Sequence, residues 1–412
     1  MTVPTALHRP LDRTALAPAI TDIAQALLAL MRAGGRPSME IPPAAALFLA
    51  HLSRVSGDAK YRNAASEAAE ICAEFIAEVP MQPYLYGGIA GMAWPLAHME
   101  RIGGAEDALD FESIDDLLID SVSDDVTPPY DLISGAVGLG TYFLERLPAP
   151  AAAEGLRRVI ARLEATGERD ERGMRWFTRP ELVPSTQRDS LPDGKYDLGL
   201  AHGVPGVIAF LALALLHGQD RQPAEEMLRE SVRWLMGLER PEGERGAYGV
   251  MVDPRAPRTP LRHRAAWCYG DPGIAVALLL ASRALADGEL LRGVHRTARR
   301  AAALAESERH TVVDTSLCHG SAGLGHLFGI LGRALDDEQL RLRADAWHAT
   351  TMNMRLPGEG VAGFYFARWH EGTPQIQPDA SFLQGAAGVG LSLLNALHPD
   401  GDRSWDRLLL LS

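Results

Sequence analysis

The sequence predicts an all-α protein, an α/α toroid of six to seven helix pairs, from two features. The first is a repeat: the pattern Gly-x-x-Gly, followed by an apolar segment, recurs along most of the chain. The second is an alternation between apolar segments and charged, amphipathic ones. Recurrence at a roughly regular spacing is the signature of a repeat fold. The six copies begin at Gly88, Gly135, Gly203, Gly270, Gly320 and Gly385.

The segments between and after these glycines predict two kinds of helix. Those that follow the glycines are apolar almost all round, most clearly residues 207–216, 274–285 and 324–335. A helix of this kind belongs inside a protein, whereas one with a single apolar stripe belongs outside. The amphipathic segments are residues 61–79, 156–166, 223–238, 290–308 and 338–347. Alternating inner and outer helices form a double-layered helical barrel, and nothing in the sequence calls for an extended sheet.

We expect one domain over residues 1–412, with residues 1–35 as an N-terminal helical extension. Residues 41–50 look like a degenerate first copy of the repeat that has lost its glycines. Two longer linkers, residues 171–198 and 241–267, are rich in Pro, Gly, Arg and Asp. Because loops of that length inside a compact domain are usually functional or disordered, we predict that they form walls of a binding cleft.

Composition narrows the class of protein. The 40 basic and 53 acidic residues give 40 − 53 = −13, which argues against nucleic acid as a partner. No signal peptide is recognised at residues 1–33, and no uninterrupted apolar run reaches the roughly 18–20 residues of a membrane span. Three cysteines are too few for a disulfide framework. We therefore predict a cytoplasmic protein without a membrane span.

Two of those cysteines occupy the same position in neighbouring repeats. Cys268 lies two residues before Gly270, and Cys318 lies two residues before Gly320. His319 follows Cys318 directly, and a histidine, His202, fills the matching position of an earlier copy. In a ring of repeats these turns would converge on the axis. Two thiolates and an imidazole are a natural set of three zinc ligands, with the fourth position open in a catalytic site. The alternative is that both cysteines are small buried apolar residues.

Three segments together resemble the signature motifs of lanthionine cyclases, the LanC-like family. They are Leu-Gly-Leu-Ala-His-Gly-Val-Pro-Gly at 198–206, Arg-Ala-Ala-Trp-Cys-Tyr-Gly-Asp-Pro-Gly at 264–273 and Leu-Cys-His-Gly-Ser-Ala-Gly at 317–323. Their order and spacing match, and the resemblance extends over residues 40–398. It implies an α/α toroid that binds one Zn²⁺ per chain through Cys268, Cys318 and His319.

The resemblance also implies a reaction. A family member adds peptide cysteine thiolates to dehydroalanine or dehydrobutyrine residues and closes (methyl)lanthionine thioether rings. Its substrate is a dehydrated ribosomal precursor peptide, and a lanthipeptide dehydratase is the expected partner. A free thiol is mostly protonated at neutral pH, and coordination to zinc would deprotonate it.

The family's site residues map onto four further positions. His202 matches the acid that protonates the enolate formed by addition, and Asp131 matches an aspartate that orients a catalytic group. Arg264 would polarise the dehydroamino acid carbonyl or stabilise the enolate, and Tyr269 would donate a hydrogen bond. The residues alone favour structural roles instead: a turn cap for His202 and a helix N-cap for Asp131. Arg264 would then form a salt bridge at the cleft rim, and Tyr269 would pack against a neighbouring turn.

Other functions remain open at this stage. A LanC-like protein that adds an external thiol such as glutathione would carry the same residues. A non-catalytic, zinc-containing peptide-binding scaffold predicts four protein ligands, and only three lie in register. Protein prenyl transfer predicts an aspartate ligand and a basic pocket, and neither is evident. The acidic run from Asp115 to Asp120 resembles a diphosphate-binding motif with one residue too many, and we interpret it as a solvated helix face.

Overall fold

The structure is a computed structural model. It describes residues 11–103, 110–122, 129–183, 188–219, 221–256, 260–370 and 373–412. The contacts divide the chain into two compact units. Unit 1 consists of Met1–Gln82, Gly87–Asp110 and Glu308–Trp405. Unit 2 consists of Pro83–Tyr86, Phe111–Ser307 and Asp406–Ser412. The single domain over residues 1–412 stays a prediction.

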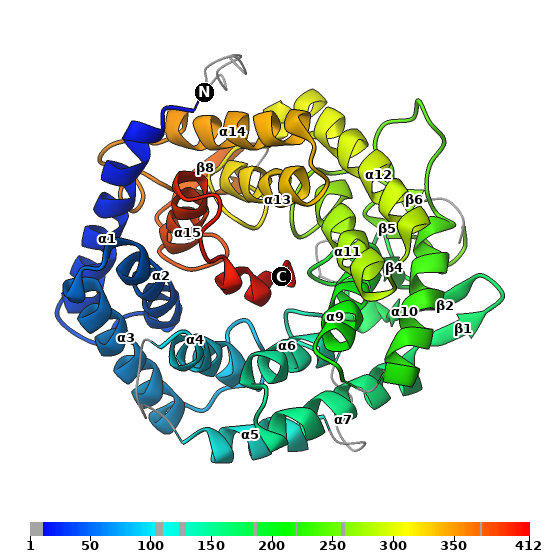
Figure 1. Ribbon diagram of the computed structural model, residues 1–412, viewed down its shortest axis with the longest axis horizontal. Coiled ribbons are helices and arrows are strands. Elements are labelled where there is room, and N and C mark those ends of the chain that lie inside the picture. Colours follow the sequence, from blue (N-terminus) through cyan, green and yellow to red (C-terminus); the bar gives the residue numbers. More distant parts are fainter. Residues whose placement is uncertain are drawn as a thin grey trace. The chain divides into compact units, whose positions relative to one another are not determined.

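Unit 1 is built mainly of helices that pack in pairs, α2 with α3 and α13 with α14 (Figure 1). Its two strands, β7 (Phe366–His370) and β8 (Thr373–Gln377), form an antiparallel hairpin in which Phe366 pairs with Gln377. Its α-helices are α1 (Leu16–Arg32), α2 (Ile41–Ser56), α3 (Ala59–Glu78), α4 (Ile89–Arg101), α13 (Ser321–Ala334), α14 (Glu338–Asn353) and α15 (Ala386–Leu397). Its 3-10 helices are η1 (Arg13–Ala15) and η3 (Arg309–Thr311).

Unit 2 follows the same plan, with α6 against α7, α9 against α10 and α11 against α12. Its α-helices are α5 (Phe111–Asp120), α6 (Ala136–Arg146), α7 (Pro150–Thr166), α9 (Val204–Leu216), α10 (Arg221–Met236), α11 (Asp271–Ala284) and α12 (Gly288–Ser307). The remaining 3-10 helices are η2 (Pro180–Leu182) in unit 2 and η4 (Ser404–Leu409), which runs into the C-terminal segment. That segment packs in unit 2, where Trp267 Nε1 donates to the carbonyl of Leu409 at 3.0 Å.

The Gly-x-x-Gly pattern has a mechanical explanation. In all six copies the first glycine is the N-cap residue of the helix that follows. The second glycine lets the first turn of the helix approach the preceding turn. In five copies a Cβ added there would lie 1.9–2.4 Å from the carbonyl oxygen six residues earlier. The glycines of these copies are Gly138, Gly206, Gly273, Gly323 and Gly388.

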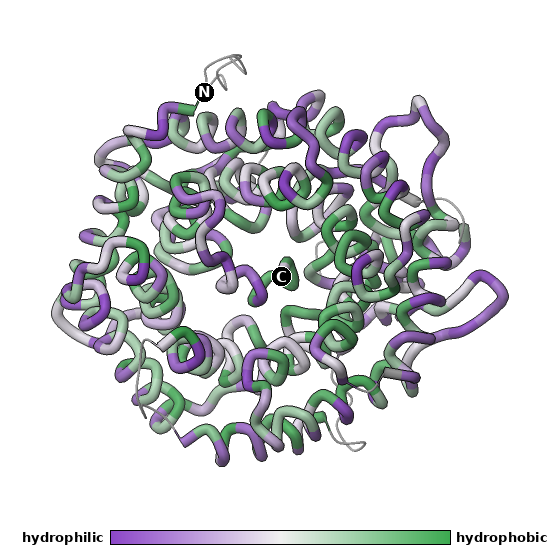
Figure 2. Tube along the Cα trace, viewed as in Figure 1, coloured by the Kyte–Doolittle hydropathy of each residue, from purple (hydrophilic) through white to green (hydrophobic). Residues whose placement is uncertain are grey.

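The predicted alternation of apolar and amphipathic helices is confirmed. Helix α9 is buried from Val204 to Ala214 and is hydrophobic along its length (Figure 2). Helix α10, which packs on it, buries a stripe spaced three and four residues apart and exposes Glu226, Arg229 and Arg233. Such a stripe is what an outer helix needs to cover an inner one. The buried residues of α10 are Ala224, Met227, Leu228, Ser231, Val232, Trp234 and Leu235.

The two long linkers differ from the expectation of loops alone. Strand β1 (Glu168–Asp170), just before the first linker, pairs antiparallel with β2 (Gly173–Arg175) inside it, and the two linkers also contain a four-stranded sheet. Strands β3 (Phe177–Thr178), β4 (Lys195–Asp197), β5 (Met251–Val252) and β6 (Pro260–Leu261) pair in that order. Strands of two or three residues are too short to show a period in the sequence. Residues 184–187 and 257–259 of these linkers lie outside the described residues.

The structure corrects the prediction that the acidic residues from Asp115 to Asp120 form a solvated helix face. Asp115 is not part of a solvated face: it is buried in unit 2, where Arg146 Nη2 lies 3.1 Å from its Oδ2 and Tyr142 donates to its Oδ1 at 2.7 Å. The protein interior tolerates the Asp115 carboxylate because Arg146 pairs with it and Tyr142 donates a hydrogen bond to it. Its neighbour Asp116 is exposed, as predicted.

The N-terminal extension is helical over the part that the structure describes, since it contains η1 and α1; residues 1–10 lie outside that part. By length and composition, residues Arg13–Arg32 could cross a membrane. The segment contains no long uninterrupted apolar run, because polar residues such as Asp22 interrupt it. Helix α1 packs against α2 and α15 of unit 1, as a core helix of a soluble protein also does. The absence of a membrane span stays a prediction.

Candidate functional site

In unit 2 the turn before α9 brings His202 to Asp131, from the turn before α6. His202 Nδ1 lies 2.5 Å from Asp131 Oδ2, and Asp131 Oδ1 accepts the Ser134 N–H at 2.9 Å. One carboxylate oxygen thus holds its own turn and the other holds the imidazole. The His202 side chain keeps 43% of its surface exposed, against 12% for Asp131. The histidine therefore presents its other nitrogen, Nε2, away from the carboxylate.

The charges around His202 favour its protonated form. Burial lowers the pKa of His202, but the hydrogen bond and charge of Asp131, with the charges of Asp197 and Cys268, outweigh burial, so the net shift is upward. An imidazole whose pKa is raised is more fully protonated at neutral pH. This is the condition that a proton donor must satisfy.

Tyr269 lies beside His202 and is held by a buried ion pair. The ring centroids of His202 and Tyr269 are 6.2 Å apart. Tyr269 Oη donates to Asp197 Oδ2 at 3.1 Å, and Lys195 Nζ lies 2.6 Å from the same oxygen. The side chains of Lys195 and Asp197 are 3% and 1% exposed. Burial, followed by the charge of Asp197, raises the pKa of Tyr269 well above its ordinary value.

Cys268 and Arg264 belong to the turn before α11. Cys268 is buried, and its carbonyl oxygen accepts the N–H of Ala201, next to His202, at 3.3 Å. This bond joins the turns that carry Cys268 and His202 within unit 2. Arg264 is exposed, and its side chain makes no hydrogen bond or ion pair with residues that the structure describes. Its guanidinium is therefore available to a ligand.

In unit 1 the turn before α13 carries Cys318 and His319. The Cys318 sulfur and a ring nitrogen of His319 lie within 4.8 Å of each other. The Cys318 N–H donates to the carbonyl of Leu383 at 3.0 Å, which ties this turn to the turn before α15. His319 Nε2 lies 3.4 Å from Oδ2 of Asp314, which is buried. A carboxylate next to one ring nitrogen is the usual way in which a metal-binding histidine is oriented.

Asp314 is ionised at neutral pH. Burial would raise its pKa, but His319 and the hydroxyl and N–H of Ser316 outweigh burial and lower it. Ser316 N–H donates to Asp314 Oδ1 at 3.0 Å. The negative charge next to His319 suits a cationic ligand, so Cys318, His319 and Asp314 fit a zinc site by donor chemistry.

Asp197, Lys195 and Asp314 were not among the predicted site residues, although the repeat contains a signal for the two aspartates. Three copies carry an aspartate six residues before the first glycine: Asp197, Asp314 and Asp379. Each accepts the N–H of the residue two positions later, at 2.8, 3.0 and 2.7 Å. In two of the three copies the second carboxylate oxygen also contacts a predicted site residue: Tyr269 for Asp197 and His319 for Asp314. Lys195 carried no comparable signal.

A sequence profile described as lanthionine synthetase C-like protein matches residues 43–410. The chain belongs to this family. The LanC-like chain is also 24% identical over 273 residues to the nisin biosynthesis protein NisC of Lactococcus lactis subsp. lactis. That alignment covers 62% of this chain and 63% of NisC, so the chain spans just under two thirds of its relative's length.

Solved structures confirm the predicted fold of the LanC-like chain. A structure named nisin cyclase matches with a TM-score of 0.73 and 20% identity, over 97% of this chain and 98% of that one. A sugar epimerase from a ruminal bacterium matches with a TM-score of 0.52 and 12% identity, over 95% and 99%. At these identities the matches speak for the fold alone, and the fold is the all-α, α/α toroid of LanC-like proteins.

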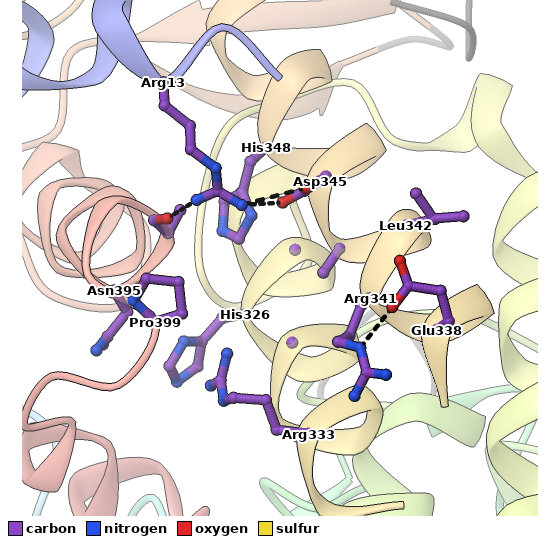
Figure 3. A pocket seen from close by; sticks show the side chains of 14 residues that line it. Arg13, His326, Arg333, Glu338, Arg341, Leu342, Asp345, His348, Asn395 and Pro399 are labelled. Atoms are coloured by element: carbon purple, nitrogen blue, oxygen red, sulfur yellow. Dashed lines mark hydrogen bonds and ion pairs between the residues drawn. The ribbon is translucent and has the colours of Figure 1, made fainter. Parts of the chain in front are cut away.

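A separate cavity of 260 Å³ lies in unit 1, among α13, α14 and α15 (Figure 3). Arg13, Arg341, His326 and His348 contribute to its walls, and none of the predicted site residues does. Its charges are largely satisfied within the protein: Arg13 pairs with Asp345 at 3.0 Å, and Arg341 Nε with Glu338 at 2.8 Å. We assign no ligand to this cavity.

Proposed function

We propose that this protein is a zinc-dependent lanthipeptide cyclase. It would add cysteine thiolates of a dehydrated precursor peptide to dehydroalanine or dehydrobutyrine residues, forming (methyl)lanthionine rings. The observation that carries the proposal is the Asp131–His202 hydrogen bond of 2.5 Å. This hydrogen bond raises the pKa of His202 and so favours the protonated imidazole next to Tyr269, within the family's motifs, where an acid is needed to complete the addition.

Cys268, Cys318 and His319 are the proposed ligands of one zinc ion per chain. Two thiolates and an imidazole from the protein leave a fourth position for the substrate. When bound, zinc supplies a lowered pKa for the substrate thiol, which therefore reacts as a thiolate. Asp314 Oδ2 lies 3.4 Å from His319 Nε2, and this carboxylate would orient the ring toward the metal.

The remaining residues of the proposed site serve the other half of the reaction. Addition of sulfur to the double bond places negative charge on the neighbouring carbonyl oxygen, and Arg264 supplies a positive charge for it. His202 Nε2–H gives a proton to the α-carbon, and Asp131 stabilises the imidazolium beforehand through Nδ1. Tyr269 contacts the peptide close to His202.

The partners follow from this chemistry. The substrate is a dehydrated ribosomal precursor peptide, so a lanthipeptide dehydratase must act before this protein. We place the reaction in the cytoplasm, a proposal supported by three cysteines that form no disulfide in the structure. Addition of an external thiol such as glutathione would use the same residues. A zinc-containing scaffold without activity is the other alternative.

The test combines metal content with ring closure. We expect about one zinc per chain in the purified protein, and a large loss of zinc in Cys318→Ala. Cys72→Ala is the matched control, because Cys72 is a buried cysteine of α3 in the same unit as Cys318. Ring closure is measured on a synthetic peptide with one dehydroalanine and one cysteine, as loss of free thiol at unchanged mass.

Each alternative predicts a different outcome. A gain of the mass of glutathione, with the peptide thiol still free, would support external-thiol addition. One zinc per chain with neither product would favour the scaffold. Carefully prepared protein without zinc would remove the central claim.

A further inference from the structure

Lys195, Asp197 and Tyr269 form a connected polar group in unit 2. The proposed reaction gives no role to Lys195 or Asp197. Asp197 Oδ1 accepts the Gly199 N–H at 2.8 Å. Its Oδ2 forms an ion pair with Lys195 and accepts a hydrogen bond from Tyr269. Lys195 Nζ also lies 5.7 Å from the centre of the Tyr269 ring, within cation–π range. The tyrosine is thus held at its hydroxyl and at its face.

The position of the ring is further limited by backbone. A Cβ added to Gly199 would lie 2.7 Å from Tyr269 Cδ1 and Cε1, so the ring lies directly on this glycine. The ring also packs against an apolar cluster that includes Val183, Val250 and Met251. With the ring and the hydroxyl both held, Tyr269 Oη has a defined direction as well as a defined place.

The donor count decides what this hydroxyl can do. A carboxylate only accepts hydrogen bonds and an ammonium only donates them. In the contact between Tyr269 and Asp197 the proton must therefore come from the tyrosine, which has one proton to give. Its oxygen is left with acceptor capacity only. A ligand that meets Tyr269 at this oxygen has to bring the hydrogen itself.

We propose that Tyr269 accepts a hydrogen bond from a backbone N–H of the substrate peptide, and that Lys195 and Asp197 are positioning residues that hold it in this state. The proposal rests on the proposed function, because it takes an extended peptide as the ligand. Backbone N–H groups are the donors that every such peptide carries, whatever its side chains. The bond would fix the peptide beside His202.

The buried ion pair is consistent with this role. A buried salt bridge is weak support for stability, because desolvation offsets much of the attraction between the charges. The contact of this ion pair with Tyr269 fixes the direction in which the tyrosine hydroxyl donates its proton. An apolar replacement would leave the hydroxyl free to rotate and to donate to the substrate instead.

A spectroscopic experiment tests the proton assignment without turnover. The zinc-loaded protein is labelled with ¹³C at Cζ of its nine tyrosines, and the Tyr269 signal is assigned by its absence in Tyr269→Phe. We expect this signal to move in Lys195→Met and in Asp197→Asn. Tyr142, which donates to Asp115 in the same unit, is the internal control and should not move. An unmoved Tyr269 signal in both variants would overturn the proposal.

A second experiment tests the peptide contact. Ring closure is measured on synthetic peptides with one dehydroalanine and one cysteine, each with a single backbone amide N-methylated. At one position we expect N-methylation to lower kcat/KM of the wild type by about five- to tenfold. The same N-methylation should leave kcat/KM of Tyr269→Phe unchanged, because that variant already lacks the contact. Tyr142→Phe is the matched control and should respond as the wild type does.

The outcomes separate this inference from the proposed function. If N-methylation at every position lowers kcat/KM equally in the wild type and in Tyr269→Phe, the contact does not exist. If the zinc-loaded wild type closes no ring on any of the peptides, the proposed function is in doubt. The ¹³C result then still decides whether the tyrosine proton is committed to Asp197.

Discussion

At the scale of single residues, the proposed roles of Asp131 and His202 predict how activity depends on pH. His202 has to be protonated to act as an acid, so ring closure slows as pH rises through its pKa. Burial lowers that pKa, but the opposing effect of Asp131, Asp197 and Cys268 is larger, so the net shift is upward. In Asp131→Asn the pKa falls, and the alkaline limb of the pH–rate profile moves to lower pH.

The size of the Asp131 effect is measurable. We expect Asp131→Asn to retain less than about one tenth of wild-type activity at neutral pH, with zinc content unchanged. Asp58→Asn is the control, because asparagine caps helix α3 as well as aspartate does. A profile that keeps its alkaline limb in Asp131→Asn would mean that another group supplies the proton.

A second residue links pH to stability instead of activity. His348 on α14 is buried; burial, with the nearby positive charges of His326, Arg13 and Arg333, lowers its pKa to about 3. Its pKa in the unfolded chain is near 6.5, so unfolding takes up a proton between these values. Stability from this group is complete above pH 6.5 and is lost as pH falls, by up to about 1.4 kcal/mol per pH unit.

The test replaces the imidazole while keeping its contact. His348 Nε2 lies 3.0 Å from Ser392 Oγ, and glutamine carries its polar atoms at a similar reach. We expect His348→Gln to flatten the loss of stability between pH 6 and pH 4, followed by chemical denaturation. His310→Gln, at an exposed position, should leave the slope unchanged. Equal slopes in both variants would show that His348 is not the group that titrates.

At the scale of elements, the glycine turns are the most sensitive part of the fold. Gly270 has a φ of 104°, and a Cβ there would lie 1.7 Å from the Arg264 carbonyl oxygen. We expect Gly270→Ala to lower the free energy of unfolding by about 2 kcal/mol or more and to reduce zinc content, because the turn holds Cys268. Thermal denaturation and metal analysis measure the two effects.

The matched control is a glycine of the next helix. Gly288 begins α12, has no heavy atom within 4 Å of an added Cβ and has no positive φ. Gly288→Ala should be neutral or stabilise the protein by about 0.5 kcal/mol, since alanine restricts the unfolded chain. Similar losses in both variants would argue against a special role for the Gly270 turn.

At the scale of the whole molecule, the proposed zinc ion would couple metal binding to folding. Its ligands lie 50 residues apart, at Cys268 and Cys318, so the unfolded chain does not present them together. A metal that binds the folded state stabilises it by mass action. We expect a chelator to lower the melting temperature of the wild type by several degrees and that of Cys318→Ala hardly at all. An equal fall in both would remove the coupling.

The sequence by itself determined the helical plan of the protein and the residues to inspect. Apolar periodicity and glycine spacing are local, so helices such as α9 and α10 could be predicted to within a few residues. The register of Cys268, Cys318 and His202 against the glycines was equally visible. The strands β3–β6 were not, because two or three residues are stabilised by their neighbours in the sheet and leave no pattern of their own.

Only the tertiary structure decided how the site residues are held. Asp131 meets His202 across 71 residues and Asp197 meets Tyr269 across 72, and no local pattern encodes such pairs. The sequence allowed Asp131 to be a turn cap or a catalytic partner, and the structure shows that its two oxygens serve both the turn and His202. It likewise placed the Tyr269 hydroxyl 3.1 Å from Asp197 Oδ2. The physical reason is that hydrogen-bond partners are chosen by packing, once the chain has returned to the same place.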